Sequence, residues 1–351
     1  MAEAASIHLN ARVRGMKSSL FTSAEIEEML QQGDLQRLIE RLLDSPYRTE
    51  LAEALTRYHG ADAVEDAVSR NLVATFNALI RRAQGELQTL VSLFLQRWDL
   101  AAVKSLLRMR HHNLSPEQIG AGLMPGPSLT VPLLSELAAQ DSMEALLTGL
   151  AGWNREMVRP LARLLPAYRD AHDLGLLEEA LDRHYFVETA RRLQNSEDED
   201  LQMLRQYLRM EIDRINLRTV FGYLQGSKSG PLADERLLPQ GLLPVTFLKD
   251  MAGSADVAAA MEKMASTLYE SAVEELFPLL QTHRFAPLER FLERIVMHEI
   301  RRMARRDVFG LGVVMDFAWL KYNEAVNLRL IARGHAGHLP VGRVREELNL
   351  A

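Results

Sequence analysis

Apolar residues recur along this chain mostly at helical spacing. Residues 20–43 predict two helices separated at Gly33-Asp34, with Ser23 as the N-cap of the first. Alternating patterns bounded by tight turns, which are typical of strands, are scarce, so the chain is predicted to be all-α. The apolar faces of the two helices are formed by Ile26, Met29 and Leu30, and by Leu35, Leu38, Ile39 and Leu42.

Three further stretches carry the same periodicity, at residues 63–84, 86–98 and 273–283. Segments rich in Pro and Gly separate the helical blocks and predict loops. These loops are expected at residues 113–132, 225–244 and 332–342. Each loop follows a similar helical segment, and this recurrence indicates internal repeats.

One pattern begins with an apolar residue and an acid, and has an arginine six positions after the apolar residue. It occurs at VEDAVSRNLVATF, LEEALDRHYFVET and LERFLERIVMHEI, with the arginines Arg70, Arg183 and Arg294. A second motif, called the phrase below, follows each copy. Its three occurrences are WDLAAVKSLL, EIDRINLRTV and YNEAVNLRLI. The acid of that phrase is Asp99, Asp213 or Glu324, and it lies 29, 30 and 30 residues after the arginine. Such matched spacing indicates three copies of one unit.

Within this phrase, the residue three positions after the acid is small or Asn, and the residue five positions after it is a base. The small or Asn position holds Ala102, Asn216 and Asn327, and the basic position holds Lys104, Arg218 and Arg329. The acid and the Asn are neighbours across one helical turn, whereas the base points roughly 160° away from the Asn. The acid and Asn can cap a neighbouring segment, and the base can reach a carboxylate or a free helix C-terminus. The spacing brings no nucleophile or tuned acid together, so these positions are predicted to be structural contacts between repeats.

The repeat also predicts how the chain is organised. The start of the chain contains Asn10-Ala11-Arg12, which resembles the later part of the phrase, and the C-terminal end echoes the beginning. An open solenoid would need polar caps on both terminal repeats. We therefore expect three helical units, 1–101, 102–215 and 216–351, with the C-terminal tail closing onto the first.

Composition narrows the function classes. The net charge of −6 and the pI of about 6.0 give no basic field for nucleic acid. The absence of Cys from the 351 residues excludes disulfides and thiolate metal sites and favours a reducing compartment. The N-terminus lacks the apolar core of a secretory signal, and the most apolar run, residues 309–320, is too short to span a bilayer.

The remaining candidate motifs do not indicate a phosphate-binding or metal-binding site. GMKSS and GSKSG lack the frame of a phosphate-binding loop. His335 and His338 form an H-x-x-H without further metal ligands, so they are predicted to be surface histidines. No catalytic, cofactor-binding or metal-binding residue is predicted.

With the repeat established, the sequence resembles a known family, the C subunits of bacterial and archaeal V-type (A/V-type) ATPases, and is similar to the d subunit of eukaryotic V-ATPases. The resemblance runs from LNARVRGMKS through RWDLAAVKSLLR and YLRMEIDRINLRTVFGYL to GVVMDFAWLKYNEAVNLRLIARG. It covers essentially the whole chain, although Ala102 and Lys104 replace the Asn and Arg of the other copies.

The resemblance implies a three-domain, all-α, pseudo-three-fold cone with a central cavity. It also implies a rotor adapter that links the shaft, built from the D and F subunits, to the membrane proteolipid ring. A protein of this kind binds no nucleotide or other cofactor, performs no chemistry and is not inserted in the membrane. It lies on the cytoplasmic side of the inner (plasma) membrane, through the complex, and passes torque between ATP turnover and proton or sodium translocation.

Two alternatives remain open at this point. A free-standing helical-repeat scaffold would bind a peptide or regulator and would be unrelated to rotary ATPases. An α-helical metal- or phosphate-dependent enzyme would need an acidic cluster such as DDxxD. Only SEDED, residues 196–200, comes near it, and this run is better explained as an acidic loop feeding a helix N-terminus.

Overall fold

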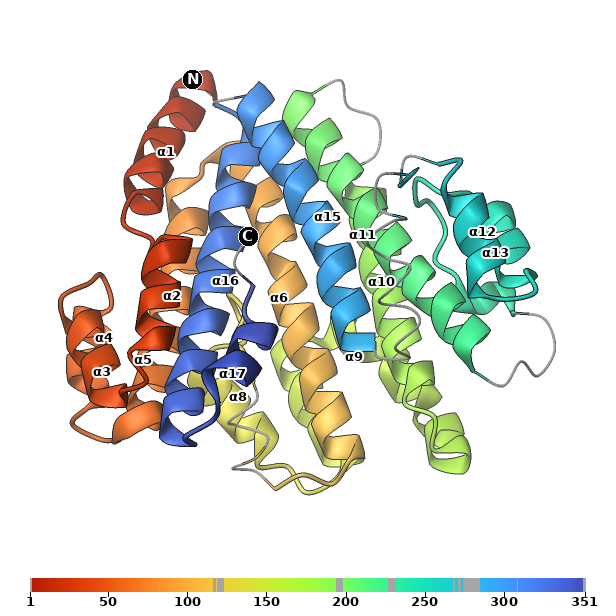
Figure 1. Cartoon of the computed structure of the whole chain (residues 1–351). Coiled ribbons are helices and arrows are strands. Elements are labelled where there is room, and N and C mark those ends of the chain that lie inside the picture. Colours follow the sequence, from red (N-terminus) through yellow and green to blue (C-terminus); the bar gives the residue numbers. More distant parts are fainter. Residues whose placement is uncertain are drawn as a thin grey trace. The chain divides into compact units, whose positions relative to one another are not determined.

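The computed structural model describes residues 2–115, 118, 123–193, 198–226, 232–267, 269–270, 273, 285–307 and 309–349, and only the backbone of 2–6 and 285–290. These residues form fifteen α-helices and one short 3-10 helix, and no β-strand is found among them. The prediction of an all-α chain is therefore confirmed (Figure 1). The helix predicted at 273–283 lies, apart from Val273, outside the described residues.

The chain forms two compact units. The first comprises residues 1–181 and 304–351, and the second comprises residues 182–303. The boundaries fall within α10 (Gly175–Arg192) and α15 (Phe285–Arg306). The predicted division into three units and their three-fold arrangement stay predictions.

The first unit contains the long helix α16 and, in its described part, nine further whole helices. The ten are α1 (Ala2–Lys17), α2 (Ser23–Gln31), α3 (Leu35–Leu43), α4 (Arg48–Ala54), α5 (Gly60–Arg82), α6 (Gly85–His111), α8 (Val131–Ala138), α9 (Met143–Ala171), α16 (Leu311–Ala336) and α17 (Val341–Glu347).

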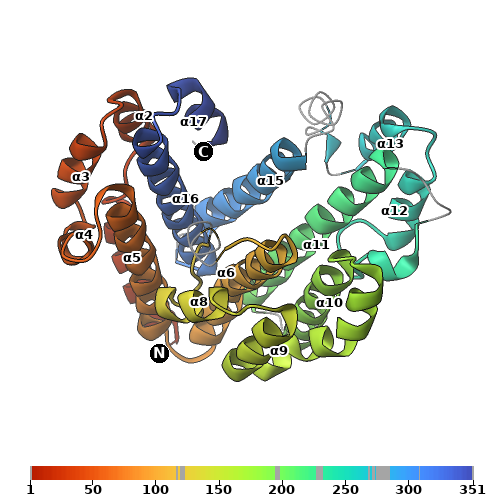
Figure 2. The same ribbon diagram turned by 90° about the horizontal axis from the view of Figure 1, so that it is seen from below.

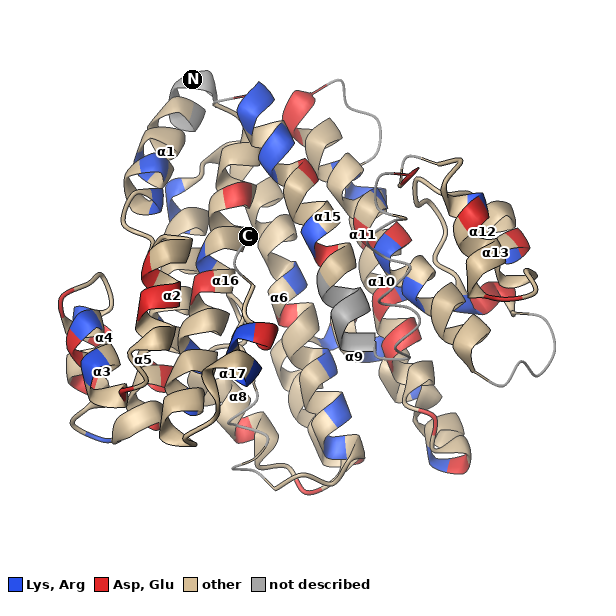
Figure 3. Cartoon of the chain, viewed as in Figure 1, with Lys and Arg blue, Asp and Glu red and all other residues tan. Residues whose placement is uncertain are grey.

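Helix α16 packs against α1, α2, α3, α5, α6 and α17, and Figure 2 shows α5 and α16 side by side. α16 is buried along most of its length, and its buried residues include polar and charged side chains as well as apolar ones. The N-terminal and C-terminal parts of the chain therefore share one core. Basic and acidic residues are interspersed along the helices, in keeping with the low net charge (Figure 3).

The start of α2 lies one residue earlier than predicted. The N-cap is Thr22 rather than Ser23, because Thr22 has the extended backbone of a cap and forms a capping box with Glu25. The Thr22 hydroxyl accepts a hydrogen bond from the Glu25 amide at 3.2 Å, and the Glu25 carboxylate accepts one from the Thr22 amide at 2.8 Å. Ser23 is instead the first helical residue.

The predicted loop at 332–342 is also partly wrong, because α16 continues to Ala336. Gly334 is not a helix breaker here but a point of close approach. A Cβ at Gly334 would lie 2.5 Å from a methyl group of Val344 in α17. The glycine lets α17 fold back onto α16 within a few residues.

The second unit contains α11 (Glu199–Gln225), the 3-10 helix η1 (Asp234–Arg236), α12 (Val245–Ala252) and α13 (Val257–Met264). Asp198 caps α11 by accepting a hydrogen bond from the Leu201 amide at 3.0 Å, so the predicted acidic helix start is confirmed. The C-terminal half of α11 packs against α12 and α13. Their shared core includes Phe221, Leu248, Met251, Met261 and Met264.

No helix among the described residues combines the length and the apolar character needed to cross a membrane.

Gly334→Ala tests the close approach of α16 and α17. The added methyl group overlaps Val344, and we expect a loss of about 1–3 kcal/mol in the free energy of unfolding. In a Val344→Ala background the overlap disappears, so the same change should be neutral or stabilise by up to about 1 kcal/mol, from helix propensity alone. Urea unfolding of the four chains measures this coupling, and purely additive effects would contradict the packing argument.

Candidate functional site

In each copy, the acid of the repeated phrase accepts a hydrogen bond from a backbone amide of a loop. Asp99 in α6 is 2% exposed. Its Oδ1 accepts hydrogen bonds from the backbone amides of Leu129 (2.8 Å) and Ser128 (3.1 Å). Its Oδ2 accepts one from the Ser128 hydroxyl at 2.7 Å, and the Trp153 indole donates to that same hydroxyl oxygen at 3.1 Å.

Asp213 in α11 repeats this arrangement. It is fully buried, and it accepts hydrogen bonds from the Leu243 amide at 3.1 Å and from the Tyr269 hydroxyl at 2.9 Å. Leu243 lies 30 residues after Asp213, just as Leu129 lies 30 residues after Asp99. The two copies therefore hold the same position of the following loop.

Glu324 in α16 has its partners at the opposite end of the sequence. Its carboxylate accepts hydrogen bonds from the Phe21 amide at 2.6 Å and from the Tyr47 hydroxyl at 2.6 Å. Tyr47 follows Phe21 by 26 residues, the same interval that separates Tyr269 from Leu243. An acid, a loop amide and a tyrosine hydroxyl thus recur together, with the N-terminal segment supplying the loop for the last copy of the phrase.

A buried lysine accompanies the Glu324 contact. The Lys321 ammonium donates to the Tyr47 hydroxyl at 2.7 Å and to the Glu324 carboxylate at 3.0 Å. Burial lowers the pKa of Lys321, and the charge of Glu324 opposes that shift. Burial also raises the pKa of Tyr47, so its phenol stays protonated and donates to Glu324. The three side chains satisfy one another's hydrogen-bonding groups in a buried position.

The Asn of the phrase binds both the amide and the carbonyl of one later residue, and this pair of hydrogen bonds is called the clip below. Asn216 donates to the Leu238 carbonyl at 2.9 Å and accepts from the Leu238 amide at 2.7 Å. Asn327 makes the same pair of bonds with Asn349, both at 2.9 Å. The clipped residue lies 22 positions after the Asn in both copies. In the first copy Ala102 has no side-chain amide and cannot form this clip.

The bases of the phrase are placed less uniformly. Lys104 and Arg218 are half-buried, whereas Arg329 is 6% exposed. Arg329 pairs with Glu65 of α5 at 3.5 Å and donates to the Leu123 carbonyl at 2.5 Å. Arg333, one turn further along α16, also pairs with Glu65.

The arginines of the first repeated pattern bind backbone carbonyls in two copies. Arg70 donates to the Glu50 carbonyl at 2.6 Å, and Arg183 donates to the Leu237 carbonyl at 2.9 Å. Arg294 lies over the ring of Phe291 in its own helix, with its guanidinium carbon 5.4 Å from the ring centre.

Two glycines leave room for the buried aspartates. A Cβ at Gly126 would lie 2.1 Å from Asp99 Oδ1, and a Cβ at Gly241 would lie 2.1 Å from Asp213 Oδ1. These positions do not need glycine for a left-handed backbone, since neither has a positive φ. They need it because the carboxylate occupies the space of a side chain.

Sequence reasoning misses several partners and misplaces one histidine. His335 is buried, not a surface residue, and its Nε2 lies 3.0 Å from the Met29 carbonyl oxygen. The patterns that mark the phrase do not identify Tyr47, Tyr269 or Lys321. Extending the repeat comparison by 26 residues beyond the loop position could have paired the two tyrosines.

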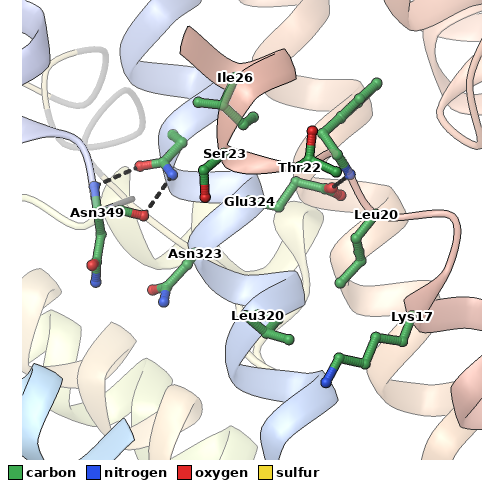
Figure 4. Close-up of a pocket in the computed structure, with 11 residues that line it drawn as sticks. Lys17, Leu20, Thr22, Ser23, Ile26, Leu320, Asn323, Glu324 and Asn349 are labelled. Carbon is green, nitrogen blue, oxygen red and sulfur yellow. Dashed lines mark hydrogen bonds between the residues drawn. The ribbon is translucent and has the colours of Figure 1, made fainter. Parts of the chain in front are cut away.

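The described residues contain no group of three or more His, Cys, Asp and Glu side chains that could hold a metal ion. A cavity of about 240 Å³ lies beside the Glu324 contact, between the start of α2 and α16 (Figure 4). Its walls include Leu20, Ile26, Leu320, Asn323 and Asn349.

Asn216→Ala and Asn327→Ala form a matched pair of variants. Removing Asn216 strands the buried amide and carbonyl of Leu238, and we expect a loss of about 2–4 kcal/mol in the free energy of unfolding. Asn349 is half-buried, so water can replace the lost bonds and the loss for Asn327→Ala should be about 1 kcal/mol. Urea unfolding compares the two, and equal losses would refute the assigned difference in burial cost.

Burial raises the pKa of both Asp99 and Asp213 to about 6, above the 3.8 of an exposed aspartate. Between these values the folded chain binds more protons than the unfolded chain, so the two groups add stability below about pH 4 that is lost as the pH rises through 6. Asp99→Asn/Asp213→Asn removes this dependence. Relative to the parent, the variant should gain stability between about pH 4.5 and about pH 7, by up to about 3 kcal/mol per site. Urea unfolding at both pH values measures the gain, and a pH-independent difference would contradict it.

Comparison with known proteins gives the chain a family. The model of the ATP synthase (C/AC39) subunit family matches residues 9–347. The chain is 28% identical to the C subunit of the A-type ATP synthase of Methanococcoides burtonii, over 97% of this chain and 93% of that protein. It is 26% identical to the C subunit of the V-type ATP synthase of Deinococcus radiodurans, over 97% of this chain and 90% of the relative. A match over almost every helix of the fold means that this chain belongs to the ATP synthase (C/AC39) subunit family.

Proposed function

We propose that this chain is the central-stalk rotor adapter of an A/V-type rotary ATP synthase. In this role it links the shaft, formed by the D and F subunits, to the membrane proteolipid ring. It transmits torque between ATP turnover and proton or sodium translocation, and it does no chemistry itself. Family membership over residues 9–347 supports the proposal.

The observation that carries the adapter role is how the loops are held. Asp99, Asp213 and Glu324 each bind a backbone amide from a buried position on a long helix. Opening any of these contacts removes a hydrogen bond from a buried carboxylate, which is costly. Loops fixed in this way resist deformation, and a body that passes torque needs that stiffness.

We further propose that the eight polar residues of the phrase brace the seams between three related units. On this proposal the units close around a central cavity, as a pseudo-three-fold cone. The residues are Asp99, Lys104, Asp213, Asn216, Arg218, Glu324, Asn327 and Arg329. The contacts of Glu324 with Phe21 and Tyr47 support closure, because they join the last copy of the phrase to the first residues of the chain. The adapter would lie at the cytoplasmic face of the inner membrane, held there by the complex.

Reconstitution tests the proposed function. The purified chain is mixed separately with the detergent-solubilised proteolipid ring and with the D–F shaft, and binding is measured by co-purification. Both should bind, and binding should weaken between about 0.1 M and about 1 M salt if polar loops make the contacts. In vesicles holding the whole complex, ATP-driven ion transport should require this chain.

The matched control is the same complex assembled without the chain. It should still hydrolyse ATP but should transport no ions, because torque no longer reaches the ring. A chain that binds neither the ring nor the shaft would overturn the adapter role and favour a free-standing scaffold.

A further inference from the structure

The first copy of the phrase lacks the backbone clip that the other two possess. Asn216 and Asn327 each hold the amide and the carbonyl of the residue 22 positions later. Ala102 occupies the corresponding position in α6, and the residue 22 positions after it is Met124. This stretch of loop must therefore be held in another way, or it must be held less firmly.

A side chain from a different copy reaches this stretch. Arg329 of α16 donates from Nη1 to the carbonyl of Leu123 at 2.5 Å, and it contacts the sulfur of Met124. The contact is buried, since Leu123 is 4% exposed and Arg329 is 6% exposed. The donor thus binds the backbone one residue before the position where the missing Asn would have acted, although it comes from more than 200 residues away in the sequence.

The guanidinium is itself held in place. Its Nη2 lies 3.5 Å from Glu65 Oε2 of α5, and Arg333 pairs with the same carboxylate. Glu65 is 9% exposed and balances the charge that Arg329 carries into the interior. Loss of Arg329 would leave Glu65 paired with Arg333, so no buried carboxylate would become isolated.

The loop beyond Leu123 is held at its other end by Asp99. The amide of Gly126 donates to the Leu129 carbonyl at 3.2 Å, and the amides of Ser128 and Leu129 donate to Asp99. A cavity of about 320 Å³, lined in part by Leu123, Pro125 and Arg329, borders the same stretch. The Arg329 contact at Leu123 and the Asp99 contacts at Ser128 and Leu129 therefore hold the two ends of this loop.

We propose that Arg329 is a latch that replaces the absent Asn of the first copy. It ties the start of the loop at 123–129 to α16, while Asp99 of α6 holds the end of the loop. The loops of the other two copies are clipped by the Asn of their own phrase. The first copy is consequently a place where a displacement of α16 is passed directly to a loop of another repeat. This inference concerns the chain alone and does not rest on the rotor function.

Hydrogen exchange followed by mass spectrometry tests the latch in the full chain. Arg329→Met removes the donors but keeps an elongated apolar side chain. Peptides that contain Gly126, Ser128 and Leu129 should exchange at least about tenfold faster, while peptides covering 232–244 should not change. Arg218→Met, at the same phrase position in the second copy, is the matched control and should leave peptides over 123–130 at the parent rate.

A second-site variant keeps the test sharp if Arg329→Met destabilises the whole chain. Ala102→Asn restores the clip within the first copy, so it should slow exchange over 123–130 in the Arg329→Met background. A general loss of stability would raise exchange everywhere and would not respond to Ala102→Asn at this loop alone. Parent-like exchange at 123–130 in Arg329→Met, or no protection gained from Ala102→Asn, overturns the proposal.

Discussion

A buried polar group must find its partner inside the protein, and this constraint organises the chain. Helices α6, α11 and α16 each carry a carboxylate into an apolar core, and each carboxylate accepts a backbone amide from a loop. Desolvation makes such a carboxylate costly if it is left alone, so the helix and the loop are stable only together. The loops are thereby tied to the helices at defined positions, although they have little regular structure of their own.

The same constraint explains why a glycine lies against each of the two buried aspartates, in the loop that the aspartate binds. The carboxylates of Asp99 and Asp213 approach the loop backbone so closely that a side chain at Gly126 or Gly241 would occupy the same space. The close contact of the carboxylate with the loop backbone thus requires a residue without a side-chain carbon, which is glycine. Glu324, whose side chain is longer by one methylene, reaches its loop amide at Phe21 instead.

The all-α fold and the recurring phrase can be predicted from the sequence, because helical periodicity and matched spacing are local properties. The phrase also marks Asp99, Asp213, Glu324, Asn216 and Asn327 as contact residues, without identifying what they contact. Their partners, such as Leu129 and Leu238, are bound through the backbone, so their side chains leave no signal. The prediction for His335 is wrong for a related reason, since a Gly-rich segment suggests a surface loop while the residue lies in the last turns of a buried helix.

The pairing of Glu324 with Phe21 and Tyr47 has a consequence for how the protein is made. A ribosome releases the first fifty residues long before it reaches position 324, and until then the Tyr47 phenol lacks its acceptor. The contacts that α1, α2 and α3 make with α16 can form only after that last long helix has emerged. Folding of this unit is therefore expected to complete late in synthesis, and a chain cut short before α16 would leave α1 and α2 without their packing against that helix.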